Sequence, residues 1–188
     1  MQVSTAEFRR GLKIELDGNP YTIVDFQHVK PGKGGAFVRT KLKHLRLGTV
    51  VDRTFRSGEK FGTVDFEQKA MQFLYRDDDQ FHFMSLKTYE QIELPMESVG
   101  EAAQYLKENM EVDVLSINGA PFGVELPTFA ELRVVRTDPG LRGDTASGGG
   151  GSKPATVETG AVIQVPLFVN EGDVLRVDTR SGAYIERA

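Results

Sequence analysis

The sequence of 188 residues contains no cysteine and no tryptophan. Without cysteine there can be no disulfide bonds and no thiolate metal sites, which fits a cytoplasmic protein. No run of apolar residues approaches the roughly 18 needed to span a bilayer, so we expect no association with a membrane. The first seven residues also lack the basic and apolar segments of a signal peptide.

Signatures of catalytic and metal sites are also missing. The three histidines, His28, His44 and His82, do not have the spacing of metal ligands, and we interpret them as surface or partly packed residues. The acidic run at residues 77–79 predicts a charged turn, with a divalent-ion site as the alternative. No catalytic or cofactor-binding motif occurs, and no pair of carboxylates can be given acid and base roles. We therefore predict a protein that is not an enzyme and that binds neither a cofactor nor a metal.

Charge is distributed unevenly along the chain, although the net charge is only −4. Residues 1–64 carry 12 Lys and Arg against 6 Asp and Glu, a net charge of +6. Residues 65–126 carry 4 against 13, a net charge of −9, and residues 127–188 carry 7 against 8. A basic first third on an acidic chain indicates a polyanionic ligand at that end.

Most of the sequence has the pattern of short strands and turns. Residues 13–16 and 21–24 alternate polar and apolar side chains around a turn that begins at Asp17-Gly18, which predicts a hairpin. Two further units of this kind surround Asn118-Gly119 and residues 180–182. The pattern is typical of small β-barrels or sandwiches.

Helical signals are few. A capping box at Ser4 and Glu7 predicts a single turn that stops at Gly11. A second capping box, at Ser98 and Glu101, predicts a helix over residues 97–109. The apolar side of this predicted helix either binds a partner or packs on the core of its own barrel, and we favour the core. It consists of Val99, Ala102, Ala103 and Leu106.

Boundaries are expected near residues 58–62 and 126–127, which gives domains at residues 1–64, 65–127 and 128–188. The glycine run at residues 148–151 has the composition of a flexible linker. The chain beyond it is too short for an independent domain, so we interpret the run as a loop inside the third domain.

The segment Pro31-Gly32-Lys33-Gly34-Gly35 joins two apparent strands. Its three glycines lack side chains, so the backbone can approach a ligand closely, and Pro31 stiffens the entry to the loop. The segment has neither the Ser or Thr nor the spacing of a phosphate-binding loop. Taken alone, it is either an ordinary turn with a lysine or an amine presented to a ligand.

The strand after this loop favours the second interpretation. Arg39, Lys41 and Lys43 recur at every second position, so they share one face of the strand. Arg46 and Arg53 add further positive charge nearby. Three aligned cations on one sheet face suit contacts with the phosphates of a nucleic acid.

Several longer motifs resemble the elongation factor P family over essentially the whole chain. They are GLKIELDG at residues 11–18, HVKPGKGGAFVRTKLK at 28–43, KPATVETGA at 153–161, VPLFVNEGD at 165–173 and VDTRSGAY at 177–184. The resemblance implies an all-β protein of three small barrels arranged in an L shape. The first barrel would be SH3/KOW-like and the other two OB-like, with one or two short helices.

The resemblance also implies a function in translation. A member of this family is expected to bind the 70S ribosome between the P and E sites, in contact with ribosomal RNA and the peptidyl-tRNA. It would promote peptide bond formation, including the first bond, and relieve stalling at consecutive prolines. We expect a cytoplasmic monomer.

Site residues follow from the same resemblance. Lys33 is expected at the tip, near the CCA end of the tRNA, as a target for a modifying enzyme, and the sequence leaves its modification state open. The other expected contacts are the tip loop Pro31, Gly32, Gly34 and Gly35, the RNA-binding residues Lys30, Arg39, Lys41 and Lys43, the E-site codon loop Gly143, Asp144 and Thr145, and Tyr184 and Arg187 in the third domain.

Two other functions compete with this one. A general single-strand RNA-binding module is disfavoured because the middle domain is acidic and the chain has no tryptophan for stacking. An enzyme that uses Lys33 as a Schiff-base nucleophile would need a desolvated amine, which a loop tip flanked by glycines does not provide.

Overall fold

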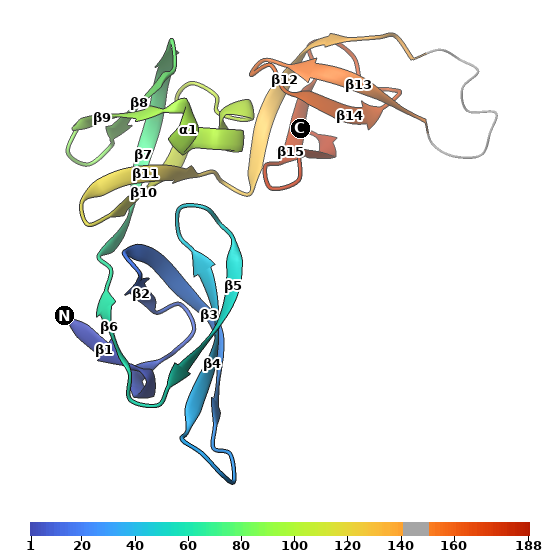
Figure 1. Cartoon of the computed structure of the whole chain (residues 1–188). Helices are drawn as coiled ribbons and strands as arrows, with labels where there is room; N and C mark the ends of the chain where they lie inside the picture. Colours follow the sequence, from blue (N-terminus) through green and yellow to red (C-terminus); the bar gives the residue numbers. More distant parts are fainter. Residues whose placement is uncertain (141–150) are drawn as a thin grey trace. The chain divides into compact units, whose positions relative to one another are not determined.

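Three β-sheets make up nearly all of the regular structure (Figure 1). The computed structural model describes residues 1–140 and 151–188. These residues form two compact units, one of Met1–Glu67 with Ser116–Pro121 and one of Gln68–Leu115 with Phe122–Ala188. The predicted all-β fold is confirmed, since one α-helix and two 3₁₀ turns are the only helical elements in the described part.

The strands of each sheet lie in a spatial order that differs from their order along the chain. From edge to edge, the first sheet consists of β1 (Gln2–Ser4), β6 (Lys60–Thr63), β2 (Lys13–Leu16), β3 (Asn19–Val29), β4 (Phe37–His44) and β5 (Val50–Arg56). The second consists of β11 (Ala120–Glu125), β10 (Glu111–Ile117), β7 (Phe66–Asp77), β8 (Gln80–Ser85) and β9 (Gln91–Pro95). The third consists of β14 (Val162–Pro166), β13 (Ser152–Val157), β12 (Phe129–Thr137), β15 (Val174–Asp178) and β16 (Ala183–Arg187).

Two-residue turns connect the predicted hairpins. Asp17 and Gly18 have φ angles of 51° and 75°, and Asn118 and Gly119 have φ angles of 49° and 79°. Positive φ at both central residues matches the right-handed twist of the flanking strands. The first turn is shorter than predicted, because Asn19 and the proline after it already pair with β2. The third predicted hairpin is confirmed as β15 and β16.

Each sheet buries one face in a hydrophobic core of its own. The first core gathers mainly aromatic and branched side chains, and the Phe55 and Phe61 rings meet edge to face at 4.6 Å between centroids. Its buried members are Phe8, Ile14, Ile23, Val38, Leu42, Phe55 and Phe61.

The predicted first turn is the 3₁₀ element η1 (Thr5–Glu7). Glu7 Oε2 accepts a hydrogen bond from the Ser4 N–H at 2.8 Å, as expected of a capping box. The turn ends at Glu7 and not at Gly11. Thr5 is buried, and its hydroxyl accepts the Gly58 N–H at 2.8 Å, which fastens this corner to the end of the sheet.

The prediction of one helix over residues 97–109 is wrong. The chain forms α1 (Met96–Val99) and then the 3₁₀ element η2 (Gly100–Gln104). Gly100 breaks the helix at φ 58° and ψ −137°, and the residue before α1 is Pro95, so Ser98 caps nothing. Farther on, Asn109 and Met110 exchange backbone hydrogen bonds with Phe73 of β7, and Asn109 adopts a φ of 69° in a turn, so the chain does not continue as a helix.

The apolar side of this segment packs on the core of the second sheet, so the interpretation as core is confirmed. Val99 and Leu106 are buried there, and Ala102 and Ala103 lie against them. Within the described ranges, no helix is long and apolar enough to cross a membrane.

Candidate functional site

The loop of residues 30–36 joins β3 to β4 and extends beyond the end of the first sheet (Figure 1). Val29 and Phe37 form the last pair of the ladder below it. Ala36 accepts a hydrogen bond from the Ser57 N–H at 3.0 Å, which ties the second root of the loop to the turn after β5. The base of the loop is therefore held by β3, by β4 and by the turn after β5.

The three glycines around the tip lysine divide into two kinds. Gly34 has a φ of 104°, a conformation that L side chains rarely adopt, and the Pro31 ring lies 4.0 Å from the place of a Gly34 Cβ. Gly32 and Gly35 have open space around them. The loop thus requires glycine at Gly34, while Gly32 and Gly35 keep its surroundings free of side chains.

Lys33 lies exposed in this loop, and so does Lys30. Neither makes a hydrogen bond or an ion pair with the described residues, so both amines are available to a ligand. An exposed lysine of this kind lacks the desolvated surroundings that a nucleophilic amine requires, and it suits the positioning of a ligand.

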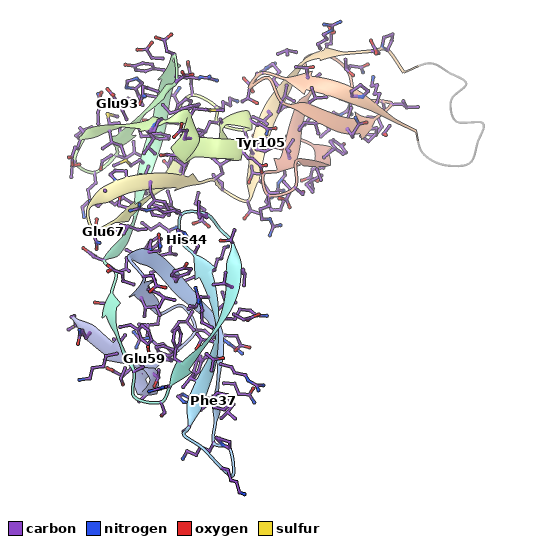
Figure 2. The ribbon with its side chains drawn as sticks, viewed as in Figure 1. Phe37, His44, Glu59, Glu67, Glu93 and Tyr105 are labelled. Carbon is purple, nitrogen blue, oxygen red and sulfur yellow. The ribbon has the colours of Figure 1, made fainter. Side chains whose placement is uncertain are left out.

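The cations of β4 lie on one face, as predicted. Arg39, Lys41 and Lys43 are exposed, and the residues that alternate with them are buried. Phe37 and His44, labelled in Figure 2, mark the two ends of this strand, and the three cations lie between them. Arg39 leans toward the tip, with its guanidinium carbon 5.6 Å from the centre of the Phe37 ring.

Arg53 does not extend this row. It pairs with buried Thr40, so it belongs to the opposite face of the sheet. Arg46 lies in the turn after β4 and is exposed.

Sequence reasoning missed the residues that flank the cations. Asp25 on β3 and Asp52 on β5 both pair with Lys41. Arg10 binds Asp25 Oδ1 through Nη2 at 2.9 Å and Nε at 3.2 Å. This guanidinium lowers the pKa of Asp25, with smaller contributions from the Phe26 N–H and the charge of Lys41. Only the register of the sheet reveals these neighbours, because the pattern of residues along one strand does not show which residues of other strands lie opposite.

The interpretation of the histidines is correct for His28 and wrong for the other two. His44 is buried, and its Nδ1 accepts the N–H groups of Arg46 and Leu47 at 3.1 Å each, which fixes the turn after β4. His82 is also buried and stacks on Tyr75 at 4.3 Å between ring centroids. Within the described residues, no three potential ligands cluster as a metal site. The acidic run at residues 77–79 lies at the turn between β7 and β8, as predicted.

The third sheet contains the last two predicted contacts. Tyr184 is half-buried and packs against the core of that sheet. Arg187 is exposed, with Nη1 3.5 Å from Asp173 Oδ2 and its guanidinium carbon 5.5 Å from the Phe168 ring centre. The predicted codon loop, Gly143, Asp144 and Thr145, lies outside the described residues, as does most of the glycine run.

Family models match nearly the full length of the chain. The model described as "Elongation factor P (EF-P) KOW-like domain" matches residues 4–61, the "Elongation factor P (EF-P) OB domain" matches 66–124, and "Elongation factor P, C-terminal" matches 130–187. The chain belongs to the elongation factor P family.

Curated relatives agree with these matches. The elongation factor P of Moorella thermoacetica is 57% identical over 186 residues, which cover 99% of this chain and 100% of the relative. That of Pelotomaculum thermopropionicum is 55% identical over 185 residues, which cover 98% of this chain and 99% of the relative. This family member is accordingly a translation elongation factor and not an enzyme.

A solved structure supports the fold assignment. The eukaryotic translation initiation factor 5A from Methanococcus jannaschii is 25% identical and superposes with a TM-score of 0.53, covering 67% of this chain and 94% of that one.

Proposed function

We propose that this elongation factor binds the 70S ribosome between the P and E sites, beside the peptidyl-tRNA. Its Lys33 loop would reach the CCA end of that tRNA, near the peptidyl transferase centre. In that position it would promote peptide bond formation, including the first bond, and relieve stalling at consecutive prolines. One observation carries the proposal: Lys33 has no partner within the described residues, and its loop leads directly into the strand that carries Arg39, Lys41 and Lys43.

Physical chemistry supports this role. Proline is conformationally restricted, so a peptidyl-tRNA that ends in prolines reaches a reactive geometry rarely. A cationic arm that holds the tRNA end contributes orientation and needs no chemistry of its own. The row on β4 would bind phosphates of the tRNA or the ribosomal RNA, through contacts that weaken with salt.

Further roles belong to the same proposal. Lys33 would be the target of a modifying enzyme that lengthens the arm, and mass spectrometry of the peptide containing Lys33 reads its state. Gly143, Asp144 and Thr145 would contact the E-site codon, and Tyr184 and Arg187 would contact tRNA or ribosome. The domains would be residues 1–64, 65–127 and 128–188, in a monomer that works in the cytoplasm.

The central prediction concerns Lys33. We expect Lys33→Ala to lower synthesis of a Pro-Pro-Pro reporter by about ten- to a hundredfold, because a lost positioning contact costs orientation at the reacting centre. Reporter yield in a reconstituted translation system is the measurement. Lys87→Ala, which removes an exposed lysine from the turn between β8 and β9, is the matched control and should match wild type. Equal yields with wild type, Lys33→Ala and no factor would refute the proposed function.

A further inference from the structure

The outer surface of β3, β4 and β5 consists of three rows of side chains that run across the strands. In the first row, Arg39 lies between Gln27 and Thr54. In the second, Lys41 lies between Asp25 and Asp52. The third has Lys43 between Thr22 and Val50. Two rows thus carry a cation with neutral neighbours, and the middle row carries a cation between two carboxylates.

The spacing makes these neighbours electrostatically important. Side chains directly opposite on paired strands have Cβ atoms about 4.5–5.5 Å apart, and successive rows lie about 7 Å apart along a strand. By this spacing, the Cβ atoms of Asp25 and Asp52 are nearer to that of Lys41 than those of Arg39 and Lys43 are. Asp25 is shared with Arg10, at 2.9 Å from Nη2, whereas Asp52 makes no ion pair or side-chain hydrogen bond with any described residue.

The first two rows border a shallow hollow. Its volume is about 240 Å³, and its border consists of residues 25–27, 39–41 and 52–54. One end of the hollow has Arg39 beside the polar side chains of Gln27 and Thr54, and the other end has Lys41 between the two carboxylates. Arg53 also borders the hollow, but its pairing with Thr40 assigns its side chain to the opposite face. An anion is therefore favoured at the Arg39 end and opposed at the Lys41 row. The opposition comes chiefly from Asp52, which is unpaired among the described residues, since Asp25 is already bound by Arg10.

We propose that Asp25 and Asp52 are specificity-determining residues that divide the cationic face, so that an RNA backbone is bound at Arg39 and Lys43 and repelled between them. Only RNA whose phosphates match these two places then binds well. Other RNA, which the row of three cations alone would attract, is rejected, because repulsion of wrong partners supports specificity as much as attraction of the right one. The inference rests on the proposed function in taking RNA as the polyanion.

Asp52→Asn tests the inference directly. We expect this variant to bind a short oligouridine strand about three- to tenfold more tightly than wild type. A plot of the logarithm of its binding constant against the logarithm of the salt concentration should be steeper by about 0.7. This is the change in slope expected for one further phosphate contact on a single strand. Asp77→Asn is the matched control, since it removes the same charge from the exposed end of β7 in the second sheet. If the two variants bind oligouridine equally tightly, the inference is overturned.

Two further variants test the same inference by removing a cation instead of a carboxylate. Arg39→Gln should reduce the salt slope for oligouridine by about 0.7, and Lys41→Gln by less than half as much, because Lys41 is already partly neutralised. Equal reductions would overturn the inference. Circular dichroism of each variant checks that the sheet is intact.

Binding to 70S ribosomes separates this inference from the proposed function. If wild type fails to bind ribosomes but Asp52→Asn binds oligouridine more tightly than Asp77→Asn, the proposed function fails and the division of the face stands. If wild type binds ribosomes and the two variants do not differ on oligouridine, the inference fails and the proposed function stands.

Discussion

At the scale of single residues, the chain distinguishes charges that are held from charges that are free. Asp178 accepts three hydrogen bonds from Arg180, one from the backbone and two from the guanidinium, at 2.8–3.1 Å. Lys33, in contrast, makes no ion pair with the described residues. We therefore expect Lys33 to respond to a ligand and Asp178 to respond mainly to pH.

The held carboxylate leads to a prediction about pH. The side chain of Arg180 is the main cause that lowers the pKa of Asp178 from 3.8 to about 2. A pKa that is lower in the folded chain means that the contact stabilises the fold fully above about pH 4 and is lost as the pH falls toward 2. A carboxyl NMR titration of Asp178 should show a midpoint near 2. In Arg180→Gln the midpoint should rise toward 3.8, and an unchanged midpoint would contradict this assignment.

At the scale of elements, turns were predictable and registers were not. Asp17-Gly18 and Asn118-Gly119 specify their hairpins locally, because both residues of each pair tolerate positive φ. The cationic face of β4 was also predictable, because the alternation of charged and uncharged residues along one strand is a local pattern. The carboxylates beside Lys41 come from strands 16 and 11 residues away, and only the pairing of strands brings them there.

The mistaken helix has an equally physical cause. Residues 97–109 have helical spacing, but Gly100 adopts a φ of 58°, and Asn109 is bonded to Phe73 of another strand. Local propensity favoured a helix, and contacts with β7 outweighed it.

This break in the helix gives a prediction at the same scale. Gly100→Ala places a Cβ on a backbone conformation that is costly for other residues, so we expect the free energy of unfolding to fall by about 1–3 kcal/mol. Urea denaturation followed by circular dichroism measures the change. Ala102→Gly, in the regular part of the same segment, provides the comparison and should cost about 1 kcal/mol or less. A Gly100→Ala variant as stable as wild type would contradict the strain argument.

At the scale of the whole molecule, contacts within the second unit join the second sheet to the third. Lys107 Nζ lies 3.2 Å from Glu158 Oε1, and the Thr159 hydroxyl donates to the Gln104 carbonyl at 2.5 Å. Partial burial raises the pKa of Glu158, but hydrogen bonds from the Arg133 N–H and Lys107 outweigh it and lower the pKa overall. These bonds favour one relative placement of the two sheets.

We expect Glu158→Gln to loosen this placement. Spin labels at Lys87 and Gln164, on the two sheets, should show a broader distance distribution by pulsed electron resonance. The effect should be modest, because a pair this exposed contributes only about 0.2–1 kcal/mol. Glu186→Gln removes a similar ion pair, with Arg176, inside the third sheet, and should leave the distribution unchanged. Equal distributions in all three proteins would show that the ion pair does not hold the sheets.

The pairing of β1 with β6 has a consequence for folding during synthesis. Gln2 lies opposite Gly62, so the first strand of this sheet to leave the exit tunnel waits for the last one. At about 5–20 residues per second, that wait lasts roughly 3–12 s. During this interval Phe8 has neither Phe55 nor Phe61 to pack against. Until Lys60–Thr63 emerges and closes the sheet, Phe26 is the one aromatic partner among the described residues available to Phe8, so part of the Phe8 side chain stays exposed on the nascent chain.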